Sequence, residues 1–522
     1  MYFTEAFKSS PHSIPSPDGK YVATLLPTSI VVRAVASLGI IRTIKLAPDV
    51  SCVTALAWSP SSSRVLVATP DRFHVFSAPH GDFRGVVQVP QPPATKPAFV
   101  TFGATDDEVC VFSPVGIKMT MANLVSSKAV EISNPKFFSA PFAPRGCSFR
   151  PGTRHLALLT RTAGKDIVSI HSPDTREIQR SWYPETVDAQ GISWTLDGKW
   201  LVVWDSPGHG TRVLLCTHDG HAFKDWRGEH PQSAMNNMDQ YGPGVKSLAF
   251  SPDGRFTAVA HGSNRISILN ERLMEEMRLH HVPTVEPKET LQIWQEQIDP
   301  RAGQRSVPSF VRATQAVSLP GLSSSSVSDV RHGCNLAKFD PSSCLLASRL
   351  EDASSTIWIW DVPTSELRAV LMFHTNVTKV EWHPSQPELL LMRCEGEGYS
   401  SLVFVWDPLS NGPRPIDFSR HLPSAKVTGR ADATWLKTIN ESAALFFTDH
   451  AKYILLSLAD ADTDAALPWT PQLTVNPHAN MAMPTDSNMP HSNTDEDGDS
   501  TDTDEEITEL NDTFHFKKSP VP

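Results

Sequence analysis

The chain has 522 residues, of which 40% are hydrophobic and 20% are charged, and this balance excludes a wholly disordered protein. Its net charge of −11 is concentrated near one end, since ten carboxylates and no lysine or arginine lie between Asp495 and Asp512. The residues before Asp495 include 47 acidic and 44 basic side chains, a net charge of −3, so nothing in their charge favours a nucleic-acid or membrane surface.

Seven cysteines are scattered along the chain, and no two of them form a Cys-x-x-Cys motif. This distribution encodes neither a disulfide framework nor a local zinc site. The first five residues, Met-Tyr-Phe-Thr-Glu, lack the basic and apolar regions of a secretory signal, and no stretch approaches the ~18 apolar residues of a membrane span. We therefore expect a soluble protein of a reducing compartment, the cytosol or the nucleus.

One pattern recurs along the chain: an aromatic residue, a short turn rich in Ser, Pro, Asp and Gly, and an apolar β-run. Ser16–Gly19 leads into Tyr21–Ala23 in this way, and Phe250–Gly254 is a later copy. The nine anchor positions are Pro15, Trp58, Phe102, Phe149, Trp194, Phe250, Phe339, Trp382 and Trp435. The steps between them are 43, 44, 47, 45, 56, 89, 43 and 53 residues, and most are close to the ~40–45 residues of a four-stranded propeller blade.

Each copy has the chemistry of a hairpin, because Pro fixes φ in the turn and Asp-Gly supplies a side-chain acceptor and a positive φ. A further β-run follows about ten to fifteen residues later, and in Ile357–Asp361 and Val403–Asp407 it ends in Trp-Asp, the dipeptide that names the WD repeat. The sequence therefore predicts an all-β WD-repeat β-propeller over residues 1–465, with about nine blade-like repeats. Since 4–8 blades are typical, we expect seven to nine blades, either as a large ring or with an incomplete additional sheet array.

Closure of such a ring needs an edge strand from one terminus to complete the sheet formed by the other, because an open edge leaves backbone groups unpaired. The alternating segment Tyr2–Phe7 suits this role. We expect it to pair with the strand near Tyr453–Leu456.

The 89-residue step contains an insertion, residues 271–329, for which we expect a short helix followed by a flexible loop. Leu291, Trp294 and Ile298 have the i, i+3, i+7 spacing of one helical face. This face either packs on the side of the propeller or docks a partner, so the three residues are candidates for partner binding. Long insertions in compact folds are often functional.

Residues 466–522 are rich in Pro, Asn, Thr and Asp and too poor in apolar residues to offset the entropy of ordering, so we expect a disordered acidic tail. Thr494, Thr501 and Thr503 each precede an acid by three residues and are candidate sites for an acidophilic kinase. The tail also contains a second set of candidate partner-binding residues, either a helix-forming docking motif or incidental apolar residues in a solvated tail. They are Leu510, Phe514 and Phe516.

Motifs of nucleotide-binding loops, hydrolase elbows and zinc proteases do not occur. The His218–His221 segment is better explained by a hairpin turn at Asp-Gly than by a metal site. We therefore predict no catalytic residue, no metal, no cofactor and no small-molecule substrate, and a protein that is not an enzyme.

Several stretches together resemble one WD-repeat family, usually called WD-repeat protein eight, a propeller of spindle poles and centriolar satellites. The start of the chain, a Val-Val-Trp-Asp segment and the position of the insertion distinguish this family from other propellers. The stretches that carry the resemblance are Phe3–Lys8, Ser16–Tyr21, Val31–Arg33, Gly191–Trp194, Val202–Asp205, Gly244–Pro252, Ile266–Asn270 and Trp358–Asp361.

The resemblance implies an adaptor in the cytoplasm and cytoskeleton, at the spindle pole body or centrosome. Such adaptors join a coiled-coil anchoring protein and help to anchor microtubule minus ends, with a minus-end-directed kinesin or a gamma-tubulin complex as further partners. The alternative is an RNA- or ribosome-associated propeller of the translation-initiation type, where rings of about nine blades occur. The near-neutral charge before the tail counts against that alternative.

Overall fold

The computed structural model describes residues 1–48, 50, 52–88, 99–139, 143–228, 244–297, 307–319, 333–423, 425–459 and 466–470. The chain divides into two units, Met1–Thr470 and Pro471–Pro522. The second unit lies outside the described residues, so the prediction that the tail is disordered stays a prediction. No helix in the described part is long and apolar enough to cross a membrane.

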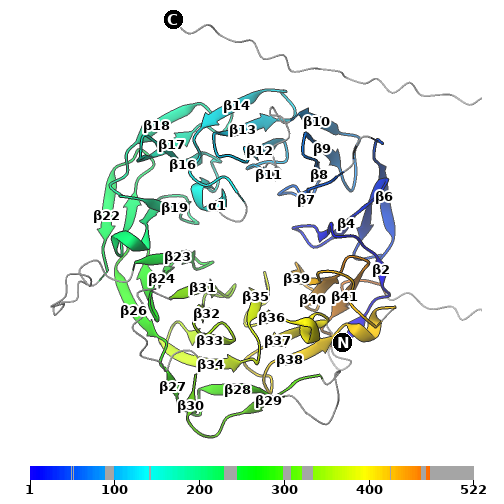
Figure 1. The fold of residues 1–522 in the computed structure, drawn as a ribbon, viewed down its shortest axis with the longest axis vertical. Coiled ribbons are helices and arrows are strands. Elements are labelled where there is room, and N and C mark those ends of the chain that lie inside the picture. Colours follow the sequence, from blue (N-terminus) through cyan, green and yellow to red (C-terminus); the bar gives the residue numbers. More distant parts are fainter. Residues whose placement is uncertain are drawn as a thin grey trace, which may run out of the picture. The chain divides into compact units, whose positions relative to one another are not determined.

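Nine sheets, each built around four antiparallel strands, follow one another around a ring, which confirms the predicted propeller and sets its blade number at nine (Figure 1). The first strand of a blade, such as β11, β23 or β35, lies towards the centre in this view, and β10, β22, β26 and β38 lie at the rim. The first blade consists of β3 (Ser13–Pro15), β4 (Tyr21–Leu26), β5 (Ser29–Ala34) and β6 (Ile40–Lys45), the second of β7 (Ala55–Trp58), β8 (Arg64–Ala68), β9 (Arg72–Ser77) and β10 (Arg84–Gln88), and the third of β11 (Phe99–Phe102), β12 (Glu108–Phe112), β13 (Lys118–Asn123) and β14 (Ala129–Ser133). The fourth consists of β15 (Cys147–Phe149), β16 (Leu156–Thr162), β17 (Lys165–His171) and β18 (Ile178–Trp182), the fifth of β19 (Ala189–Trp194), β20 (Leu201–Asp205), β21 (Val213–Cys216) and β22 (Ala222–Trp226), and the sixth of β23 (Val245–Phe250), β24 (Phe256–His261), β25 (Arg265–Asn270) and β26 (Glu275–His280).

The last three blades include one sheet that is enlarged by the insertion and one that is closed by the N-terminus. The seventh contains β31 (Cys334–Phe339), β32 (Leu345–Leu350), β33 (Thr356–Asp361) and β34 (Glu366–Met372), the eighth contains β35 (Val377–Trp382), β36 (Leu390–Cys394), β37 (Leu402–Trp406) and β38 (Arg414–Asp417), and the ninth contains β39 (Asp432–Leu436), β40 (Ala444–Thr448) and β41 (Lys452–Ser457) with β1 (Tyr2–Phe3) and β2 (Phe7–Lys8). The helical segments among the described residues are α1 (Ala143–Gly146) and the single 3-10 turns η1 (Pro207–His209), η4 (Glu397–Tyr399) and η5 (Ser419–His421).

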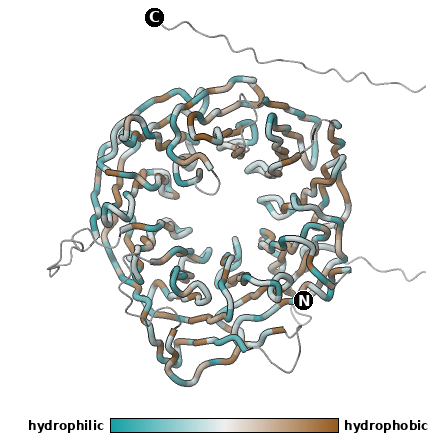
Figure 2. The backbone as a smooth tube through the Cα atoms, viewed as in Figure 1, coloured by the Kyte–Doolittle hydropathy of each residue, from teal (hydrophilic) through white to brown (hydrophobic). Residues whose placement is uncertain are grey.

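The core is divided among the junctions between blades. Buried apolar side chains of the described residues form nine clusters, and each cluster joins two neighbouring blades. Leu346 belongs to the cluster between blades six and seven, whereas Leu345 and Ala347 on the same strand belong to the cluster between blades seven and eight. Each blade is therefore apolar on both faces, and hydrophobic segments occur all around the ring (Figure 2).

The ring closes as predicted. Tyr2 and Phe3 pair with Ser457 and Leu456, and the β2 strand continues the same edge along β41. Just beyond β2, the buried Ser9 hydroxyl lies 2.9 Å from Thr448 Oγ1 of blade nine. The N-terminus thus supplies the missing outer strand of the last blade, and the two ends of the repeat array are joined by backbone pairing.

The insertion differs from the prediction in extent and in structure. It begins after His280 rather than at residue 271, because Glu275–His280 is the outer strand of blade six. Its described elements are four strands, so the expected helix is wrong. They are β27 (Thr284–Val285), β28 (Gln292–Gln297), β29 (Ser309–Arg312) and β30 (Val317–Ser318). The β28 strand pairs in parallel with β34, and β29 pairs with β28, so blade seven has six strands.

The helix prediction failed because β28 is buried on both faces. Ile293 contributes to the cluster between blades six and seven, and Trp294 to the cluster between blades seven and eight. A strand of this kind shows no alternation of apolar and polar residues, so its apolar positions can match a helical spacing by accident.

The compact unit extends past the predicted boundary at residue 465. Trp469 is buried in the cluster between blades nine and one, where it joins Val35 and Leu38. The Thr470 amide donates a hydrogen bond of 2.9 Å to the Ala36 carbonyl. The first residues assigned to the tail are therefore part of the folded unit.

Candidate functional site

The antiparallel order of each blade places its connections on two opposite faces of the ring. The turns from first to second strand and from third to fourth strand lie on one face, called here the turn face. The turns from second to third strand and the links between blades lie on the other, the linker face. Each recurring Ser-Pro-Asp-Gly turn connects a first strand to a second strand, so these motifs gather on the turn face.

On the turn face, the recurring turns bind one another. The Asp18 amide of blade one donates to Ser62 Oγ of blade two over 3.1 Å, and the Asp253 amide of blade six donates to Ser343 Oγ of blade seven over the same distance. These turns therefore join adjacent blades at two of the junctions. Their role in the fold is structural.

The linker face carries a short link with exposed apolar side chains between blades four and five, residues 183–188. Tyr183 and Val187 are 66% and 59% exposed. The Lys165 ammonium lies 5.8 Å from the centre of the Tyr183 ring, within range of a cation–π interaction. We call residues 183–188 the display linker.

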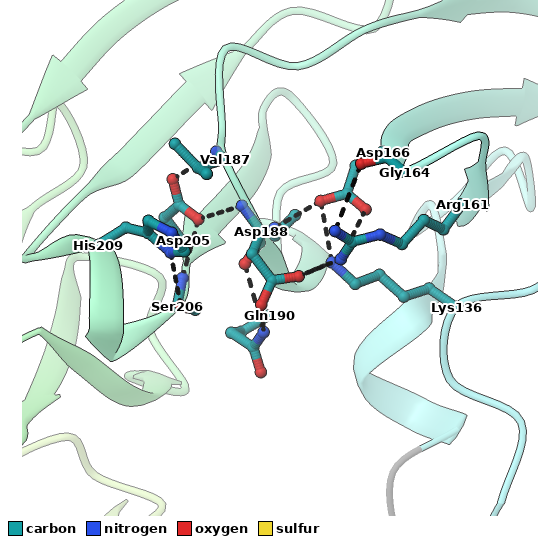
Figure 3. Close-up of polar contacts among 11 residues, drawn as sticks. Lys136, Arg161, Gly164, Asp166, Val187, Asp188, Gln190, Asp205, Ser206 and His209 are labelled. Atoms are coloured by element: carbon teal, nitrogen blue, oxygen red, sulfur yellow. Dashed lines mark hydrogen bonds and ion pairs between the residues drawn. The ribbon is translucent and has the colours of Figure 1, made fainter.

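Buried carboxylates hold the backbone of the display linker and of the strand that follows it (Figure 3). Asp205, at the end of β20, accepts hydrogen bonds from the amides of Val187 and Asp188 over 2.8 and 2.7 Å. Asp166, on β17, accepts a bond of 2.7 Å from the Ala189 amide. Amides bound to charged acceptors form strong hydrogen bonds, so the backbone is held at the last two residues of the linker and at the first residue of β19.

Two cations balance these carboxylates. The Lys136 ammonium lies 2.9 Å from Asp166 Oδ2 and 2.8 Å from Asp188 Oδ1, and Arg161 also pairs with Asp188. Burial opposes ionisation of Asp188, but the hydrogen bonds and charges of Lys136 and Arg161 outweigh it and lower the pKa of this carboxyl. Since Lys136 and Asp166 are both buried, the loss of either partner leaves an unpaired charge.

This arrangement is suited to binding rather than to chemistry. The network uses its polar atoms to position backbone, and it leaves Tyr183 and Val187 directed to solvent on a fixed link. A surface that is rigid before binding loses less conformational entropy when a partner docks. Across the described ranges, no group of three or more His, Cys, Asp or Glu side chains could hold a metal ion.

The predicted partner-binding residues do not form this surface. Leu291 and Trp294 are buried against the propeller rather than presented on a helical face, so the alternative in which the insertion packs on the propeller fits them better. The other candidates lie outside the described residues. They are Ile298, Leu510, Phe514, Phe516, Thr494, Thr501 and Thr503.

Sequence reasoning did not identify the display linker. One signal was available, because Asp205 completes the Val-Val-Trp-Asp segment. Its amide partners lie 17 and 18 residues away in the chain. Of the two cations, Lys136 comes from the link between blades three and four, and Arg161 comes from β16 of blade four. Nothing in the local sequence brings these groups together.

The blade pattern agrees with the comparisons. No family model matches the chain. The WD repeat-containing protein WRAP73 of Mus musculus is 26% identical over 440 residues, which cover 78% of this chain and 87% of the mouse protein. An uncharacterized WD repeat-containing protein of Schizosaccharomyces pombe is 21% identical over 380 residues, which cover 70% of this chain and 73% of that protein.

The chain is similar to WD-repeat proteins over most of its length. Among solved structures, a eukaryotic initiation factor and the Dos1 propeller each match this chain with a TM-score of 0.47, at 12% and 11% identity. The matches cover 80% of this chain and 89% and 94% of those chains. A similarity of this size carries no argument about function, so the RNA- or ribosome-associated alternative stays a prediction.

Proposed function

We propose that this WD-repeat protein is a non-catalytic scaffold that acts as an adaptor at the spindle pole body or centrosome. In this role it joins a coiled-coil anchoring protein and helps to anchor microtubule minus ends, with a minus-end-directed kinesin or a gamma-tubulin complex as further partners. WD-repeat propellers generally bind proteins and are generally non-catalytic, which supports the first half of the proposal. The sequence resemblance described above supports the second half.

The display linker is the observation that carries the scaffold role. It combines two side chains that are more exposed than buried, those of Tyr183 and Val187, with a backbone that Asp205 holds at Val187 and Asp188. Tyrosine is enriched in the energetically dominant centres of protein interfaces, because it supplies a large contact area at a low cost in entropy. We therefore assign the display linker as a protein-binding surface.

Co-purification tests this surface directly. The full chain and a Tyr183→Ala/Val187→Ser variant are tagged, expressed at equal levels in dividing cells, and their bound proteins are quantified by mass spectrometry. Leu409→Ser serves as the matched control, because Leu409 is 92% exposed but lies on the turn face. We expect the double variant to lose at least one partner that the wild type and the control retain. If all three proteins recover every partner equally, the display linker is not the protein-binding surface.

A second variant separates the rigidity of the linker from its side chains. Asp205→Asn keeps the size of the side chain but weakens the charged hydrogen bonds to the Val187 and Asp188 amides. We expect faster hydrogen exchange at these two amides, together with weaker recovery of the partner that depends on Tyr183. Unchanged exchange would show that Asp205 does not hold the link.

Localisation tests the spindle-pole part of the proposal. A fluorescent tag on the full chain is followed through mitosis together with a pole marker. We expect a focus at each pole. A diffuse signal through every stage of division would contradict the adaptor role at the pole while leaving the scaffold role open to the co-purification test.

A further inference from the structure

The outer edge of blade seven ends in a strand that the other blades lack. In the described structure β29 is the last strand of a six-stranded sheet and pairs with β28 alone (Figure 1). Its central residue, Val311, is 54% exposed. An edge strand presents unpaired N–H and C=O groups, which act as a template for another strand.

The register shows which backbone groups of β29 are available. The Ala313 amide donates to the Ile293 carbonyl over 2.8 Å, and Val311 lies opposite Gln295. Hydrogen-bonded and non-hydrogen-bonded positions alternate along an antiparallel pair, so Val311 and Ala313 direct their backbone groups towards β28. Phe310 and Arg312 direct theirs away from the sheet.

We infer that β29 pairs with β29 of a second copy of this chain, antiparallel and about a two-fold axis at Val311. In this register Phe310 of each copy exchanges backbone hydrogen bonds with Arg312 of the other. The two outward-facing amides and the two outward-facing carbonyls of each β29 strand are then all hydrogen-bonded to the other strand. Two six-stranded blades become one continuous sheet across a symmetric interface.

Side-chain chemistry favours this register. The two Val311 side chains lie directly opposite each other at a non-hydrogen-bonded position, where side chains approach most closely. Each Arg312 guanidinium lies beside Phe310 of the second copy, an arrangement that suits a cation–π interaction. Arg312 forms no ion pair with the residues that the structure describes.

The neighbouring symmetric registers are poorer. Pairing centred on Arg312 places two guanidiniums directly opposite each other, and like charges in that position are destabilising. Pairing centred on Phe310 leaves the Arg312 backbone groups without partners from the second strand. Charge and hydrogen bonding therefore select the register centred on Val311.

The strand has only four residues, so we expect a weak dimer that forms with rising concentration. Sedimentation equilibrium of the full chain over roughly 1–300 μM tests this, a range that corresponds to about 5 to 8 kcal/mol of association energy. Val311→Asp places two negative charges directly opposite each other at the two-fold axis. The variant should therefore stay monomeric over the whole concentration range. Ile178→Asp is the matched control, because Ile178 on β18 is also an exposed aliphatic residue of an outer strand, 61% exposed, and should dimerise like the wild type.

Cross-linking tests the register itself. The opposed positions at the axis are separated by about 4.5 Å between Cα atoms, which permits a disulfide. Val311→Cys should therefore form a covalent dimer under mild oxidation at least tenfold faster than Ile178→Cys. The wild type has two exposed cysteines of its own, Cys52 and Cys344, so it gives the background rate of covalent dimer formation.

Three outcomes would overturn the inference. The first is a monomer at all concentrations, and the second is a dimer that Val311→Asp leaves intact. The third is cross-linking of Val311→Cys no faster than that of the control. If the chain is monomeric but a co-purified protein is lost from Val311→Asp, the edge belongs to another partner and the second-copy assignment is wrong.

Discussion

The His281 Nε2 atom lies 2.8 Å from Ser348 Oγ, although 67 residues separate the two in the chain. The intervening residues include the whole insertion. Trp360 Nε1 donates to the same hydroxyl over 2.8 Å, and His281 Nδ1 lies 2.9 Å from the Asn264 carbonyl. The end of blade six is thus fixed to the second and third strands of blade seven, and the insertion leaves the ring from a rigid base.

Ser348→Ala should destabilise the protein because it leaves the Trp360 indole N–H and the His281 ring nitrogen buried without a partner. We expect a loss of about 1–3 kcal/mol in the free energy of unfolding, measured by urea titration. Ser318→Ala, at an exposed position on β30, is the control and should change it by less than about 0.5 kcal/mol. Equal midpoints for both variants would show that the His281–Ser348 contact does not stabilise the ring.

Buried histidines should make stability depend on pH. Burial lowers the pKa of His281, His261 and His383 to about 4, from an ordinary value of 6.5. Between these values the unfolded chain binds protons that the folded protein does not, so stability falls as the pH decreases from 6.5 to 4. Above pH 6.5 both states are neutral at these positions and the effect disappears. The difference amounts to at most about 3 kcal/mol for each histidine.

Urea unfolding at pH 7.5, 6.5, 5.5 and 4.5 checks this prediction. His281→Asn removes one of these titrating histidines, so the decrease in stability between pH 6.5 and 4.5 should be smaller in the variant than in the wild type. Carboxylates titrate mainly below this window and contribute little to the comparison. A pH dependence as steep as that of the wild type would contradict the assignment to His281.

The buried Glu108–Arg176 pair joins blade three to blade four. Arg176 Nε lies 2.6 Å from Glu108 Oε1, and Arg176 Nη2 lies 2.8 Å from Oε2, a bidentate geometry. Removal of one partner leaves a buried charge without its counter-charge. Glu108→Gln or Arg176→Met should therefore each reduce the free energy of unfolding by about 3–5 kcal/mol. The double variant should cost clearly less than the sum of the two.

Thermal or chemical unfolding of the four proteins completes this double-mutant cycle. Glu131→Gln is a suitable control, because Glu131 pairs with Lys118 at the surface and a pair of this kind contributes at most about 1 kcal/mol. Strict additivity of the Glu108 and Arg176 effects would refute the coupling.

Much of the fold could be predicted because each blade repeats the same local chemistry. The aromatic anchor, the turn and the second β-run lie within one blade, so their spacing alone indicated about nine repeats and a ring of seven to nine blades. The pairing of Tyr2–Phe7 with the last blade was also predictable, since a closed ring leaves only the termini to complete it. The strand character of Gln292–Gln297 was not, because it depends on parallel pairing with β34.

The candidate site was less accessible to sequence reasoning. The display linker has no motif, and its rigidity depends on Lys136, Asp166 and Asp205 from three different segments. The outward-facing groups of β29 likewise depend on register, which a slip of one residue would reverse. Properties of this kind arise from tertiary structure and leave little trace in local spacing.

Trp469 provides the last prediction, because it lies beyond the boundary that composition suggested at residue 465. Its side chain is buried with Phe7, Val35 and Leu38 at the junction where the ring closes. Trp469→Ala in the full chain should therefore reduce the free energy of unfolding by about 3–5 kcal/mol, as expected for truncation of a large buried aromatic residue. Leu409→Ala, at a position that is almost fully exposed, should change it by less than about 0.5 kcal/mol. If the two variants unfold at the same urea concentration, Trp469 belongs to the tail rather than to the closure of the ring.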